Sequence, residues 1–149
     1  MNRQQLKKRT EGFTIIEVLI VLAIAGLIML IVFLAVPALQ RNQRNNARNS
    51  DASRVAAAVT ECLANRNGST SATNGCSNTG NIQAGTLARI ETFSVGTAGA
   101  YSQIDARVVF GSRCQPEGNA IDTAATNVSS REFTVTYQLE PNTNRCISS

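Results

Sequence analysis

A single carboxylate, Glu17, lies near the start of the most apolar stretch of the chain, where the sequence reads EGFTIIEVLIV. A charged side chain inside a membrane-length segment is costly and usually has a function. The alternative is that Glu17 simply reaches the lipid headgroups.

Four cysteines could form two disulfides, because all of them follow the apolar stretch and their number is even. Three pairings are possible. Cys62–Cys76 and Cys114–Cys146 are favoured because neighbours in sequence close the shorter loops. Disulfides persist outside the cytoplasm. Free buried thiols are the alternative.

Other chemistry has little support in the sequence. The chain has no histidine, which is the commonest general base, and no lysine after Lys8. The cysteine spacings do not fit a zinc site, and neither a calcium loop nor a glycine-rich phosphate loop is present. The sequence therefore predicts no enzyme, no metal and no cofactor.

The carboxylate must be positioned by a membrane-length helix. Val18 to Leu39 is a run of 22 residues without a charge, which as a helix would be about 33 Å long and would cross a bilayer core. The preceding residues 1–12 carry four basic side chains against one acid. Positive charge holds that end in the cytoplasm. The sequence predicts a single-pass protein of the cytoplasmic membrane, with its N-terminus inside and its C-terminus outside.

The helical pattern continues beyond the membrane and ends near Asn67-Gly68. Pro37 is expected to bend or break the helix locally. We predict four segments: a leader at 1–12, an apolar membrane helix at 13–39, a continuation at 40–66 and a head at 67–149. An apolar stripe marks the second half of the continuation, at Ala52, Val55, Ala56, Val59, Cys62 and Leu63.

Three arginines, Arg41, Arg44 and Arg48, begin the continuation at near-helical spacing. We predict a solvated or intersubunit face for them. The alternative, binding of DNA phosphates, would give a steep dependence on salt.

The head is predicted to be a small antiparallel sheet with one apolar face, covered by the stripe at Val55, Val59 and Leu63. Alternating patterns indicate strands within 106–114 and 131–140, and shorter strands are expected at 120–124 and 144–148. Residues 82–95 fit either a short helix or an edge strand. The fold class is therefore α+β, a long N-terminal helix with a small sheet.

The order of residues around Gly12 resembles a known family. Behind its basic leader, GFTIIEVLIVLAIAGLI resembles the N-terminus of type IV prepilins and their pseudopilin relatives. The resemblance implies a type IV pilin fold, with the apolar helix 13–39 in the filament core. It also implies that Gly12 ends the leader, that Phe13 becomes an N-methylated terminus, and that Phe13, Thr14 and Glu17 serve assembly.

Cleavage after Gly12 would create an amine that needs an anion once it packs among apolar helices. Glu17 would lie about 6 Å from that amine along a helix that rises 1.5 Å per residue. A staggered second copy could therefore bring its amine to this carboxylate, and the pair would select the stagger.

Two further positions of the helix compare with the family in different ways. Gly26 matches a glycine where the helix often loosens in assembled filaments. The helix-bending proline of many type IV pilins falls at the position of Leu34, three residues before Pro37.

The resemblance also implies partners and a destination. The partners are a prepilin peptidase and methyltransferase, an inner-membrane assembly platform, and further copies of the chain in an extracellular filament for motility or adhesion. Direct binding of nucleic acid is not expected, since DNA uptake belongs to whole machines. The alternatives are a pseudopilin of a secretion or competence machine, in the periplasm or cell wall, and a monomeric single-pass protein with a small binding head.

Overall fold

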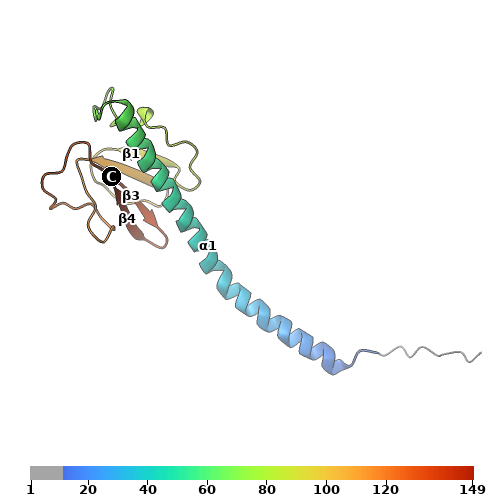
Figure 1. Cartoon of the computed structure of the whole chain (residues 1–149). Helices are drawn as coiled ribbons and strands as arrows, with labels where there is room; N and C mark the ends of the chain where they lie inside the picture. Colours follow the sequence, from blue (N-terminus) through green and yellow to red (C-terminus); the bar gives the residue numbers. More distant parts are fainter. Residues whose placement is uncertain (1–11) are drawn as a thin grey trace, which may run out of the picture. The chain divides into compact units, whose positions relative to one another are not determined.

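The computed structural model describes residues 12–149, so residues 1–11 of the predicted leader lie outside the described residues. The chain divides after Leu39 into two compact units. The elements follow the order α1, a short 3-10 helix η1 (Thr79–Asn81), β1, β2, β3 and β4 (Figure 1).

Helix α1 spans Ile15–Asn65 and has 51 residues. It continues without a break through Pro37, because a proline removes only one backbone hydrogen bond and the ladder persists on either side. The helix ends where Asn67 and Gly68 both take a positive φ, and the Gly68 N–H donates to Leu63 C=O at 2.7 Å. This is the turn with which glycine commonly terminates helices.

The first unit contains the apolar part of α1. This part is long and apolar enough to cross a membrane. Its large side chains, from Ile15 to Leu39, are exposed in the isolated chain. A lipid bilayer or other helices must cover such a surface, since isolated apolar patches of this extent are not stable in water.

The second unit contains a four-stranded sheet in the order β1-β2-β3-β4. Its strands are β1 (Thr92–Val95), β2 (Asp105–Phe110), β3 (Phe133–Leu139) and β4 (Thr143–Ser148). The teal-to-green part of α1 crosses one face of this sheet (Figure 1). The layout is α+β, as the sequence predicts.

The prediction of a purely antiparallel sheet is wrong for one strand. β1 pairs parallel to β2, whereas β2–β3 and β3–β4 are antiparallel. The connection between β1 and β2, residues 96–104, runs back along the sheet instead of forming a tight hairpin, and this return is what parallel pairing requires. The segment 82–95 thus contains an edge strand. The strand expected at 120–124 is also wrong, because only an isolated bridge between Cys114 and Ile121 forms there.

The core lies between α1 and the sheet. Val55 and Val59 are fully buried as the predicted lid, and Leu63 is partly buried. They belong to one hydrophobic core with Val108 of β2 and Val135 of β3.

The opposite face of β3 is also buried, which the alternating pattern does not predict. Thr134 and Thr136 are almost completely covered. The hydroxyl groups of Thr134 and Ser112 lie 2.8 Å apart, and Thr136 donates to Arg107 C=O at 3.4 Å. Threonine tolerates this burial because each hydroxyl has a hydrogen-bond partner.

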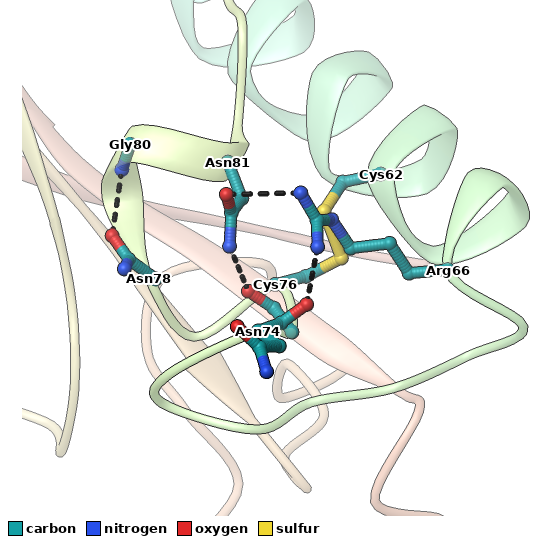
Figure 2. The surroundings of a disulfide bond; sticks show 8 residues. Cys62, Arg66, Asn74, Cys76, Asn78, Gly80 and Asn81 are labelled. Carbon is teal, nitrogen blue, oxygen red and sulfur yellow. Dashed lines mark hydrogen bonds between the residues drawn. A yellow bond between two sulfur atoms is a disulfide. The ribbon is translucent and has the colours of Figure 1, made fainter.

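Two disulfides close the head, Cys62–Cys76 and Cys114–Cys146. The first ties the end of α1 to the loop that follows it. Figure 2 shows Arg66 reaching over this bond to Asn74 C=O and to Asn81 Oδ1, the latter at 3.0 Å. Closing a loop of this length contributes about 3 kcal/mol in the chain-entropy account. Because the core of the head is small, each disulfide contributes a large part of its stability.

Candidate assembly site

The start of α1 is built as a capping box. Thr14 Oγ1 accepts from the Glu17 N–H at 3.3 Å, while Glu17 Oε2 accepts from the Thr14 N–H at 3.2 Å and from its hydroxyl at 3.0 Å. These reciprocal bonds satisfy two amide donors that the helix itself leaves free. The spacing T-x-x-E therefore positions the carboxylate at the helix start.

The carboxylate keeps capacity for another partner. Among residues 12–149, Oε1 of Glu17 accepts no hydrogen bond and no cation pairs with either oxygen. Phe13, Glu17, Val18, Val21 and Leu22 line an open hollow of about 310 Å³. A cationic amine placed there would meet an anion with apolar surroundings, which strengthens the interaction.

The proposed cleavage point is accessible. Gly12 is exposed, and a Cβ atom added there would meet nothing within 4 Å. Phe13 is 87% exposed. A protease could therefore reach the bond between them. Gly26 also has open space around it and lies within the uninterrupted helix, so its role in loosening the helix stays a prediction.

The comparison with protein families bears on this end of the chain. A family model described as the prokaryotic N-terminal methylation motif matches residues 7–33. This match supports a type IV prepilin-like protein. The match includes Gly12, Glu17 and Gly26, and it ends before Pro37 and the head. No curated protein and no solved structure shows significant similarity to the chain.

Polar contacts hold the head against α1, and the sequence pattern did not reveal the residues that make them. Arg44 Nε and Nη2 donate to the two carboxylate oxygens of Glu140 at 2.8 and 2.7 Å. Arg48 is 6% exposed; it donates to Gln103 C=O at 2.9 Å and pairs with Glu140 at 3.0 Å. The predicted solvated or intersubunit face is therefore wrong for Arg44 and Arg48, while Arg41 is exposed as expected.

Asp51 is the most deeply buried charge in the described chain, at 1% exposure. Its carboxylate accepts from the backbone N–H groups of Ala88, Arg89 and Ile90 at 2.6–3.0 Å. Burial alone would raise the pKa of Asp51, but these amides, with help from Arg54, lower the pKa below its ordinary value. Asp51 thus holds the segment leading into β1 against α1.

A signal for these contacts was present in the spacing. The apolar stripe at Val55, Val59 and Cys62 continues backward in steps of three or four residues to Asp51, Arg48 and Arg44. The period is that of one helix face. The face is continuous, but its first half consists of polar residues, so a search for an apolar stripe does not find it.

Acid should weaken the contacts between α1 and Glu140. Hydrogen bonds from Arg44, opposed by burial and supported by Arg48, lower the pKa of Glu140 from 4.5 to about 2. A lowered native pKa stabilises the fold above the ordinary value, and this contribution is lost as pH falls from about 4.5 toward 2. We expect stability to fall across this window, and to fall less steeply in Glu140→Gln. Thermal unfolding of the full chain in detergent, followed by tyrosine fluorescence, measures both slopes. Equal slopes would contradict this account of Glu140.

Proposed function

We propose that the chain is a structural subunit of a type IV pilus. It is made as a prepilin, cleaved after Gly12, methylated at Phe13 and assembled into an extracellular filament that serves motility or adhesion. The observation that carries the proposal is the methylation motif over residues 7–33, which spans both the Gly12-Phe13 bond and Glu17.

The proposal assigns a role to each part of the chain. The basic leader stays in the cytoplasm, the apolar part of α1 anchors the subunit in the membrane and then forms the filament core, and the head faces outward. A prepilin peptidase and methyltransferase process the N-terminus, and an inner-membrane assembly platform receives the product. The two disulfides fit a head that folds outside the cytoplasm. The chain itself performs no catalysis in this scheme.

The geometry at the start of α1 supports the proposed assembly contact. Cleavage creates a cationic amine at Phe13, and Glu17 of another copy supplies the anion through Oε1, which has no partner in the described chain. In an apolar environment either charge alone would be costly. The axial offset between copies that brings the two charges together is therefore favoured over offsets that leave them apart.

Mass spectrometry of the N-terminus tests the proposal. We expect assembled material to begin at Phe13 and to carry one extra methyl group. A variant with a bulky residue at position 12, Gly12→Val, should keep the leader and remain in the membrane. Assembled material that begins at Met1 would overturn the proposal and favour a single-pass protein with a binding head.

A pseudopilin of a secretion or DNA-uptake machine would have the same processing. Electron microscopy separates the two: a pilin produces long surface filaments that contain this chain, whereas a pseudopilin forms a short structure in the periplasm or cell wall. Long filaments that lack the chain would support the pseudopilin.

A further inference from the structure

Three side chains from one stretch of α1 close on Glu140, which directly follows β3. Arg44 and Arg48 bind its carboxylate. Asn45 binds its backbone: Asn45 Oδ1 accepts from the Glu140 N–H at 2.9 Å, and Asn45 Nδ2 donates to the Glu140 C=O at 3.0 Å. We call Arg44, Asn45, Arg48 and Glu140 the Glu140 clasp.

The clasp lies at one end of the contact between α1 and the sheet. The contacts along β3 show that it runs antiparallel to this part of α1. Arg131, before β3, donates to Asn67 C=O at 3.4 Å; Tyr137 donates to Asn49 Oδ1 at 2.9 Å; and Glu140, after β3, meets Arg44. The clasp therefore joins the first turns of the head's helix to the β3–β4 turn.

The two ends of this contact are held in different ways. Between Gln40 and Ser50, α1 buries only the side chain of Arg48. From Asp51 onward it buries a series of core residues and ends in the Cys62–Cys76 disulfide. Segments with few buried apolar contacts open at low free energy. The first end is thus held by polar contacts, mostly to one residue, and the second by apolar packing and a covalent bond.

We propose that the Glu140 clasp is a releasable fastening. When it opens, residues 41–49 of α1 separate from the head while α1 from Asp51 onward stays attached. The clasp therefore decides where the helix leaves the head, and Asp51 sets the limit of the separation. A load applied to α1 from its N-terminal side reaches the clasp first and passes into β3, which pairs with a strand on each side. The inference concerns the head alone and does not depend on filament assembly.

Amide hydrogen exchange of the full chain in detergent micelles, read by mass spectrometry, tests this. In Glu140→Gln the side chain keeps its size but loses its charge. We expect exchange of residues 41–49 to accelerate about tenfold or more. Residues 55–65 and the strands should exchange at the wild-type rate.

Glu132→Gln is the matched control. Glu132 also forms a two-bond pair with an arginine, Arg113, at 2.5 and 2.8 Å, but this pair does not involve α1. Glu132→Gln should leave the hydrogen exchange of residues 41–49 unchanged. Wild-type exchange of residues 41–49 in Glu140→Gln would overturn the proposal, and so would equal acceleration from 41 to 65 and in the strands.

A second variant covers the case in which Glu140→Gln does not fold. Arg44 is partly exposed, so the head should tolerate its replacement. Arg44→Gln removes two hydrogen bonds of the clasp, while those of Arg48 and Asn45 remain. The same residues should exchange faster, by a smaller factor than in Glu140→Gln. Unchanged exchange in this variant would overturn the proposal.

Discussion

Replacing Glu17 by glutamine should strongly reduce incorporation into filaments while leaving insertion and cleavage intact. Glutamine at the third helical position can still complete a capping box with Thr14. The variant therefore keeps the start of α1 and loses only the negative charge that would meet a neighbour's amine. Removing one partner of a buried charge pair costs several kcal/mol, so we expect incorporation to fall about thirtyfold or more. Quantifying the chain in sheared filaments against the membrane fraction measures this.

Two further variants identify the cause of such a loss. Thr14→Ala removes the capping hydroxyl but keeps the carboxylate, so it should lower incorporation much less than Glu17→Gln does. Glu61→Gln removes an exposed acid elsewhere on α1 and should have no effect. If Thr14→Ala were as severe as Glu17→Gln, capping of the helix would explain the result and the intersubunit pair would be refuted.

Replacing Asp51 by alanine should destabilise the head strongly. The change removes the acceptor for three backbone N–H groups, including that of Ile90, which is buried. Unsatisfied buried donors carry a desolvation penalty, and part of the loss at the more exposed amides is recovered by water. We expect the free energy of unfolding to fall by about 2 to 3 kcal/mol.

Denaturant unfolding of the full chain in detergent measures the effect of Asp51→Ala. The chain has two tyrosines and no tryptophan. Both tyrosines, Tyr101 and Tyr137, lie in the second unit, so tyrosine fluorescence reports on the head alone. Asp122→Ala is the control, because Asp122 accepts one local bond from the Ala124 N–H at the surface. A loss for Asp51→Ala no larger than the control's would show that the 88–90 segment does not depend on this carboxylate.

The N-terminal part of the chain could be interpreted from sequence because its information is local. A basic leader, Gly12-Phe13, Glu17 and an apolar run follow one another within about one membrane thickness of chain, and the methylation motif matches this stretch. The same holds for the helix end at Asn67-Gly68, where a positive φ favours glycine. The strands at 106–110 and 133–139 followed from alternation, which is also a local pattern.

The errors in the prediction concern partners far apart in the chain. The parallel pairing of β1 depends on the path of residues 96–104, and the burial of Thr134 depends on a contact with Ser112. Neither is encoded in the residue types of the strand itself. Arg48 was expected to face solvent or a neighbouring subunit because its acceptors, Gln103 and Glu140, are more than fifty residues away.

The sequence by itself determined the long helix, its apolar length, the place of Glu17 and the α+β class. These depend on periodicity and on neighbours within a few residues. Only the tertiary structure decided which face of residues 40–51 meets the head. A polar helix segment has no apolar stripe to orient it, so its inward face is defined by the acceptors and donors that other segments bring to it, here the carboxylate of Glu140 and the amides of residues 88–90.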